Sequence, residues 1–396
     1  MIKRNSVWIV FLLMLFSIGS ITTNRTEAKS KNEFSYKKEG KTITITKYNG
    51  NKKNIVVPDK IKGKKVAAIS VGAFSKAKKA TKVTLPKYLK QIDSTDGDLS
   101  MWNIRKKKLL VTTPFSGCDA LKNIQIKKGN KNFVSIKGVV YSKDRRYLHI
   151  YPAGKKQTKY SIAKKTRVIE VGAFENTVNL KNIIFNNVQT IGHGAFRASG
   201  IKKLALKKYN TVGKNAFAFC DKLETVSIGE KNGYFCGSFI GCKNLRKITV
   251  DKRNKVLYSV DGILYEQSGD KKYLLCYPAA RKGESFTIPA DVIAGGYCFS
   301  FVKNLKEVAY ESKGGLSNAF YQCKDLKITI PDKILDPSKS EGLEDTDAYD
   351  DSEWNPFLDC ENLVLRGKNN AWAKEYVKTH EGVTYEEIDV MEDKIQ

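Results

Sequence analysis

The stretch that decides the fold is AFAFCDKLETVSIGEKNGYFCGSFIGCKNLRKITV, residues 216–250. It contains one phrase twice: Phe-x2-Cys-x2-Leu, with branched aliphatic residues three and five positions after the leucine. The first copy starts at Phe217 and the second at Phe239, 22 residues later. A unit this short cannot bury its own apolar face, so it has to stack on further copies of itself. The phrase therefore predicts a solenoid.

Complete or degenerate copies of the phrase occupy most of the chain. Each opens with a phenylalanine, at Phe74, Phe115, Phe174, Phe196, Phe217, Phe239, Phe299, Phe320 and Phe357. The two aliphatic residues alternate along a strand, so they point inward with the leucine while the residues between them face solvent. We expect the strands of successive turns to pair in a continuous parallel sheet and the Phe rings to stack in the core.

A second unit, of a different kind, also occurs twice, at residues 130–155 and 254–282. The two copies align at a glycine, a tyrosine and a Tyr-Pro pair: Gly138 with Gly262, Tyr141 with Tyr265, and Tyr151-Pro152 with Tyr277-Pro278. Each copy predicts a β-hairpin with a polar tip, SKDRR in the first and EQSGDKK in the second. A larger module, over roughly 115–239 and 239–357, is thus duplicated.

Residues 1–28 predict a secretory signal peptide. Lys3 and Arg4 precede a short apolar run, and Thr26-Glu27-Ala28 offers a candidate cleavage site. A membrane anchor is the alternative, but the run is shorter than the ~20 apolar residues that a span needs. Because no second apolar stretch follows, we expect export with no membrane insertion after cleavage. The protein would then be secreted and extracellular, either free or associated with the cell wall.

The remaining chain divides into four segments. Residues 29–72 predict an N-terminal β cap that covers the open edge of the stack. Residues 73–335 form the solenoid, with an exposed insertion at 93–109. Residues 336–356 predict an acidic loop, and 357–396 a last repeat with a C-terminal cap made of a short helix and a strand.

These repeats resemble the BspA-type leucine-rich repeat family of exported bacterial surface proteins. The resemblance covers residues 34–388 and rests on the Ala-Phe pairs, the Cys-x2-Leu that follows several of them, the Tyr-Pro hairpins and the Gly-x3-Ala-x-Ala-x2-Tyr segment at Gly367. It implies a right-handed leucine-rich repeat solenoid, β-rich within the α/β class. The solenoid would have a parallel β-sheet on one face, two β-hairpin insertions and a short C-terminal capping helix. It also implies adhesion or ligand binding at the cell surface, and no catalytic residues.

Cysteine and histidine give little support for an active site. Five of the eight cysteines stand three residues after a repeat Phe, which predicts a buried column of small apolar thiols: Cys118, Cys220, Cys242, Cys323 and Cys360. The other three, Cys236, Cys276 and Cys298, fall outside this pattern, and the sequence leaves open whether any of them forms a disulfide. The three histidines lie in unrelated places, and no HExxH, GxSxG or P-loop motif is present. We therefore expect no catalytic residue, metal site or cofactor, and the alternative is an enzyme that uses the repeats as a scaffold.

Basic residues recur at fixed places in the repeat. The formal net charge is +29, and the acidic residues concentrate after Asp336. The candidate ligand-binding residues follow the repeat leucine by one or two positions: Lys122, Lys181, Lys202, Lys203, Arg246, Lys247 and Lys306, with Glu224 as an interruption. Residues four positions after the leucine are uncharged and mostly small, which predicts a smooth sheet face edged by cations.

Such a face suits an anionic partner. Teichoic acid, another anionic glycan, and a host or cell-surface protein are the candidates, and a monomer is expected. One alternative is that the lysines only keep the sheet soluble. Another is a structural wall-associated protein held by charge. Nucleic acid is not expected, because no aromatic platform interleaves with these lysines.

Overall fold

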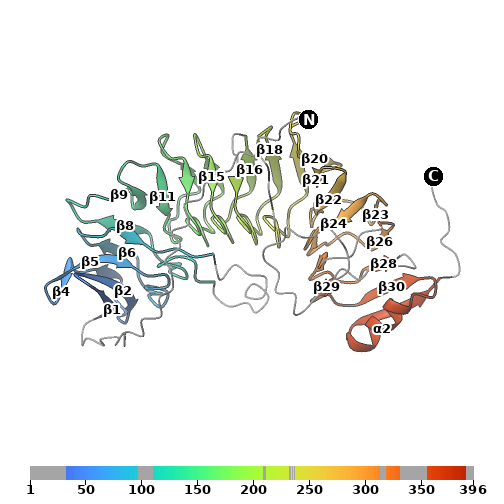
Figure 1. Cartoon of the computed structure of the whole chain (residues 1–396), viewed down its shortest axis with the longest axis horizontal. Helices are drawn as coiled ribbons and strands as arrows, with labels where there is room; N and C mark the ends of the chain where they lie inside the picture. The colour runs from blue at the N-terminus through green and yellow to red at the C-terminus, as the bar shows by residue number, and fades with distance from the viewer. Residues whose placement is uncertain are drawn as a thin grey trace, which may run out of the picture.

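In a computed structural model the described residues are 33–96, 110–207, 211–231, 233, 235, 237–312, 318–330 and 355–388. They wind into a curved β-solenoid that starts with β1 and β2 at one end and finishes with the helix α2 at the other (Figure 1). The predicted solenoid fold is confirmed. The predicted signal peptide, Cys236, and the acidic loop as far as Trp354 lie outside the described residues.

The first strands form a small mixed sheet over the N-terminal edge. Its members are β1 (Phe34–Glu39), β2 (Thr42–Tyr48), β4 (Lys60–Ile61), β5 (Lys64–Ile69) and β7 (Gln91–Ile92). The β1–β2 pair is antiparallel, and β2 then pairs in parallel with β5. Tyr36, Ile43 and Ile45 are almost fully buried beneath this sheet, so it closes the core.

The strands that carry the two repeat aliphatics pair in parallel, but they do not form the continuous sheet that we expected. They fall into three blocks. The N-terminal block is β3 (Asn54–Val56), β6 (Lys82–Leu85) and β8 (Asn123–Ile126). The central block comprises two sheets, β12 (Lys159–Ser161) with β14 (Asn182–Ile184), and β16 (Lys203–Leu206) with β18 (Thr225–Ile228) and β19 (Lys247–Val250). The C-terminal block is β23 (Ser285–Ile288), β26 (Glu307–Tyr310), β28 (Lys327–Thr329), β30 (Leu363–Gly367) and β31 (Val383–Glu387). The two breaks between blocks have one cause. The Gly138 carbonyl accepts from Ile124 N–H at 3.1 Å, and the Gly262 carbonyl accepts from Ile248 N–H at 2.9 Å, so a turn of the inserted unit takes the place of the next strand.

Each predicted hairpin is in fact a three-stranded meander. The first meander is β9 (Phe133–Ile136), β10 (Val139–Ser142) and β11 (Tyr147–Ile150), and the second is β20 (Leu257–Val260), β21 (Ile263–Ser268) and β22 (Lys271–Cys276). Both faces of β10 are buried: Val139 and Tyr141 belong to the central core, whereas Val140 belongs to the N-terminal core. The meanders therefore act as partitions between three stacked cores.

Shorter parallel ladders cover the other sides of the solenoid. They comprise β13 (Val168–Ile169), β15 (Thr190–Ile191) and β17 (Thr211–Val212), which continue from β11; β24 (Val292–Ala294), which pairs with β22; and β25 (Phe299–Ser300), β27 (Phe320–Tyr321) and β29 (Phe357–Leu358). Parallel pairing thus occurs along more than one side of each turn.

The repeat phenylalanines stack as the spacing predicts. Ring centroids lie 4.7 Å apart for Phe174 and Phe196, and 5.3 Å apart for Phe196 and Phe217, with nearly parallel planes. The stack begins on Tyr151 of the first Tyr-Pro pair, 5.0 Å from Phe174. Tyr277 stacks on Phe299 in the same way at 5.3 Å. The Tyr-Pro pairs therefore start each new column of rings.

The repeat cysteines, like the rings, make contacts from one turn to the next. Four buried thiols donate to the carbonyl of a repeat Phe in the preceding turn: Cys118 to Phe74 at 3.0 Å, Cys220 to Phe196 at 3.1 Å, Cys242 to Phe217 at 3.3 Å and Cys323 to Phe299 at 3.0 Å. The seven described cysteines are all free thiols. Burial raises the pKa of Cys276 to about 12, so this thiol stays protonated and unreactive.

The C-terminal end is closed by α2 (Ala371–Thr379), which confirms the predicted capping helix. Its N-cap, Asn370, accepts from Ala373 N–H at 2.9 Å, which satisfies one of the free donors of the first turn. The rings of Trp372 and Tyr376 lie 6.4 Å and 5.6 Å from Phe357, the last ring of the stack. Within the described part of the chain, no helix is both long enough and apolar enough to cross a bilayer.

Candidate ligand-binding surfaces

The predicted basic residues all carry exposed side chains, but the three blocks divide them. Lys122 precedes β8 in the N-terminal block, and Lys306 precedes β26 in the C-terminal block. The other five lie together on the central block. Parallel pairing places Lys203, Thr225 and Lys247 side by side, and backbone hydrogen bonds place Lys181, Lys202, Glu224 and Arg246 in successive turns.

Ion pairs remove two of the seven from this set. Arg246 Nη2 lies 2.7 Å from Glu224 Oε2, and Lys306 Nζ lies 2.7 Å from Glu284 Oε1. Glu224 therefore neutralises its neighbour as well as interrupting the column. Lys181, Lys202, Lys203 and Lys247 form no ion pair with any described residue. We call these four residues the central lysine row.

The surface beside this row is smooth. Ala205, Ser227 and Thr249 occupy consecutive strands in register, and each is the outward residue between two inward-facing aliphatics, all of them buried except the partly buried Val250. Ile184, on the neighbouring turn, is 60% exposed. The sheet thus presents small uncharged side chains with ammonium groups along one edge.

The structure also reveals a groove that the repeat spacing did not predict. It lies where β9 leaves β8, has a volume of about 700 Å³, and is lined by Thr84, Asn123, Gln125, Ser135, Lys127, Lys128, Lys137 and Lys143 among others. We call it the first groove. Lys127 Nζ lies 3.2 Å from Asp59 Oδ2, whereas Lys128, Lys137 and Lys143 are exposed and make no ion pair with a described residue. Three unneutralised ammonium groups therefore surround a polar floor.

A second groove of about 750 Å³ occupies the corresponding place before the second meander. Its lining includes Lys207, Ser227, Glu230, Lys231, Thr249, Asp251 and Arg253. Arg253 pairs with Asp251 at 2.9 Å and with Glu230 at 3.3 Å. Hydrogen bonds from Arg253 lower the pKa of Asp251 to about 2, so the carboxylate stays charged. Arg253 is therefore balanced by two acids, whereas Lys207 and Lys231 form no ion pair with a described residue.

The two junctions share backbone contacts, although the first groove is walled by its meander and the second is lined by the turns after β16, β18 and β19. Asn130 Oδ1 accepts from Phe133 N–H at 2.7 Å, and Asn254 Oδ1 accepts from Leu257 N–H at 2.8 Å. The two carboxamides also donate to matching carbonyls, of Pro86 at 3.2 Å and of Gly229 at 2.9 Å. The alignment of the meander units contained the signal for this site, because it sets Lys127 against Asp251, Lys137 against Asp261 and Lys143 against Gln267.

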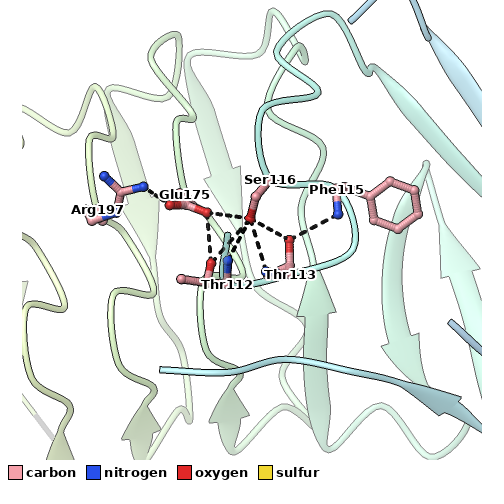
Figure 2. Close-up of polar contacts among 6 residues, drawn as sticks. All are labelled: Thr112, Thr113, Phe115, Ser116, Glu175 and Arg197. Carbon is pink, nitrogen blue, oxygen red and sulfur yellow. Dashed lines mark hydrogen bonds and ion pairs between the residues drawn. The ribbon is translucent and has the colours of Figure 1, made fainter. Parts of the chain in front are cut away.

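A buried polar cluster ties the first junction together. Figure 2 shows Glu175 between Arg197 on one side and Thr112 and Ser116 on the other. Glu175 Oε2 accepts from Thr112 Oγ1 at 2.9 Å and from Ser116 Oγ at 3.0 Å, while Oε1 pairs with Arg197. Burial lowers the pKa of Arg197 to about 10, so it remains protonated at neutral pH. Because Glu175 is only 4% exposed and Ser116 has no histidine base, this cluster serves packing.

The histidines lie apart, as the sequence suggests. His149 packs edge-on against Phe133 at 5.1 Å, and burial lowers its pKa to about 4. His193 Nδ1 lies 2.9 Å from Asp96, and the ring of His380 stacks on Tyr376 at 3.8 Å. Among the described residues no three His, Cys, Asp or Glu side chains come together in a way that could hold a metal ion.

Stacked short turns, parallel ladders on several sides and a ring column in the core define the protein as a β-solenoid of the repeat-protein class. The sequence model of the BspA type leucine rich repeat region matches six copies, at residues 44–138, 152–260 and 276–340, and the chain belongs to this family.

Solved structures and curated sequences add little beyond the fold. A leucine rich cell surface protein from Faecalibacterium prausnitzii is similar at 17% identity over 91% of this chain and 95% of its own, with a TM-score of 0.46. A leucine-rich repeat protein from Eubacterium ventriosum is 16% identical over 75% and 88%, with a TM-score of 0.42. The pneumococcal vaccine antigen PcpA is 16% identical over 92% and 100%, with a TM-score of 0.35. No curated protein matches the chain in sequence.

Proposed function

We propose that the protein is an exported, non-enzymatic binding module that holds an anionic polymer at the bacterial surface or in the surrounding medium. The observation that carries this proposal is the central lysine row, four exposed ammonium groups beside a smooth uncharged sheet face. An extended anionic chain can lie along such a face, because turns of a parallel ladder are ~4.8 Å apart and lysines stand on the turns before and after the one that carries Glu224 and Thr225.

Charge attraction of this kind is long-ranged and screened by salt. The ligand class is therefore a polymer with repeated negative groups, such as teichoic acid or a sulfated glycan, and the protein acts as a monomer in solution. Binding to a protein partner through apolar contacts would have a different signature, because it would not weaken steeply as the salt concentration rises.

The test is an array of glycans, teichoic acid and matrix proteins probed with the full chain. We expect retention on anionic polymers that falls steeply between low and physiological salt. A variant with Lys181, Lys202, Lys203 and Lys247 all changed to Glu should lose most of this binding while it keeps the wild-type melting temperature. Undiminished binding by that variant would overturn the role of the row.

A further inference from the structure

We propose that the first groove is a distinct binding site for a carbohydrate polymer that carries sulfate or phosphate groups. This inference rests on the proposed binding of anionic polymers. It adds a second binding site to the protein and names the class of ligand. The groove is built by separate parts of the chain, since β6 and β8 supply the floor and the meander supplies one wall. It lies in the N-terminal block, away from the central lysine row.

The charge of the first groove favours an anion. Lys128, Lys137 and Lys143 reach its rim from three places, the turn after β8, the turn before β10 and the tip between β10 and β11. Among the described residues, the acid that pairs with a lysine of this rim is Asp59, which engages Lys127. Converging cations on a concave surface raise the local concentration of an anionic ligand and strengthen its binding.

The floor of the first groove favours a carbohydrate over other polyanions. Thr84 and Gln125 are direct partners in the parallel pair β6–β8, so a hydroxyl and a carboxamide stand side by side on the solvent face. Both groups can donate as well as accept, which matches the hydroxyl groups of a sugar. Neither carries a charge, so the recognition of a sugar ring and that of its anionic group are assigned to different residues.

The second groove provides an internal control for this proposal. It has a similar volume and an equivalent floor, made by Ser227 and Thr249 in register. Its rim differs, because Arg253 is engaged by both Glu230 and Asp251. The lining of the second groove keeps two lysines that form no ion pair with a described residue, Lys207 and Lys231, against three in the first groove. If shape alone determined binding, both grooves would bind equally; if the three converging lysines determine it, the first groove binds more tightly.

The experiment titrates the full chain with fluorescent dextran sulfate and with a poly(glycerol phosphate) chain, and uses neutral dextran and polyglutamate as comparison probes. The first-groove variant is Lys128→Glu, Lys137→Glu and Lys143→Glu. Its matched control is Lys207→Glu, Lys231→Glu and Lys252→Glu, which makes the same change of net charge around the second groove. Thermal melts show whether both variants keep the fold.

We expect the first-groove variant to bind dextran sulfate at least about tenfold more weakly and the matched control to lose less than about threefold. Equal losses in the two variants would show attraction by net charge alone and overturn the groove site. The relative affinity for dextran sulfate and for poly(glycerol phosphate) tells which anionic group the groove prefers. Polyglutamate binding with the same affinity and the same loss would overturn the carbohydrate assignment.

The failure of this inference can be told from the failure of the proposed function. If the wild-type chain binds no anionic polymer, both are wrong. If the variant of the central lysine row loses binding while the first-groove variant keeps it, the proposed function stands and the first groove is not a site. If only the first-groove variant loses binding, the groove stands and the role of the row is wrong.

Discussion

The junction at the first meander and the junction at the second share a backbone and differ in the side chains placed on it. In both, a glycine turn blocks the strand ladder, an asparagine fixes the entry into the meander, and a Tyr-Pro pair starts a new ring stack. The first junction surrounds its groove with lysines that form no ion pair with a described residue, and it contains the buried pair of Glu175 and Arg197. The second pairs Arg253 with Glu230 and Asp251 and has Ser300 and Tyr321 in the places of Glu175 and Arg197.

This difference separates the positions that determine the fold from those that are free to acquire a function. A residue such as Asn130 or Gly138 is fixed by a buried hydrogen bond or a tight turn, so the duplicated units agree there. Exposed rim residues contribute little to stability, which leaves them free to diverge. Changes at shared positions should therefore affect both junctions alike, and changes at divergent positions should affect only one.

The largest expected effect tests what the two modules share. Phe217 and Phe320 are fully buried, and each stacks between two other rings. Truncation of either one to alanine should lower the free energy of unfolding by about 3–5 kcal/mol, because a buried ring and its packing are lost. Denaturant melts of the two variants measure this. An unchanged melting temperature for either would contradict its place in the stack.

The next effect tests a position at which the modules differ. Glu175→Ala leaves Arg197 buried without its partner, so we expect a loss of roughly 3 kcal/mol. Ser300→Ala, at the equivalent position, removes only a hydroxyl that donates to the Tyr297 carbonyl, and should cost about 1 kcal/mol. The double variant Glu175→Ala/Arg197→Ala should be less destabilised than the sum of the single changes. Similar losses at Glu175 and Ser300 would contradict the comparison.

The two meanders should differ in how pH affects their stability. His149 of the first meander occupies the position that Leu275 occupies in the second. Burial lowers the pKa of His149 from 6.5 to about 4, so the unfolded chain binds a proton at a higher pH than the folded chain does. The stabilisation that neutral His149 contributes is complete above pH 6.5 and decreases as the pH falls toward 4. Below pH 4 it does not change further. The loss is at most about 3 kcal/mol.

The measurement is the difference in unfolding free energy between pH 7 and pH 4.5 for the wild type and for His149→Leu. The other titrating groups are the same in both proteins, so they cancel in this comparison. The variant should lose less stability on acidification. Identical losses in the two proteins would show that the histidine does not contribute.

The sequence predicted the repeats well because their spacing reflects contacts between residues that are close in the chain or one turn apart. Phe217 and Phe239 are one turn apart, and their stacking at 6.1 Å follows directly from the period. The interruption of the ladder was missed because the Gly138 turn takes its place beside Ile124 only in the folded chain. The pairing of Arg246 with Glu224 was likewise missed, although the phrase already showed Glu224 one turn earlier.

The first groove was harder to predict than the ring stack. Its rim combines Lys128, which follows a repeat strand, with Lys137 and Lys143, which belong to the inserted unit. The repeat spacing predicts which residues of successive repeats are neighbours. It does not predict where the side chains of an inserted unit lie. Comparison of the two insertions with each other, residue by residue, gives the missing information.

The smallest expected effect is a gain of binding at the second groove. Asp251→Lys together with Asp261→Lys gives this junction the lysines that Lys127 and Lys137 supply to the first. The change also removes one of the two partners of Arg253. We expect affinity for dextran sulfate to rise roughly tenfold, since each added cation near an anionic surface contributes about 1 kcal/mol and exposure reduces that figure.

The control for this gain is Asp270→Lys together with Glu284→Lys, which makes the same net-charge change at exposed places outside the second groove, at the tip of the second meander and just before β23. Net charge acts at long range and should raise the affinity of both variants slightly, by about twofold at low salt. A groove acts through the convergence of cations, so only the Asp251→Lys/Asp261→Lys variant should keep its advantage as salt rises toward 0.15 M, where the Debye length is about 8 Å. Equal gains that vanish together with salt would mean that the two junctions differ in charge but not in function.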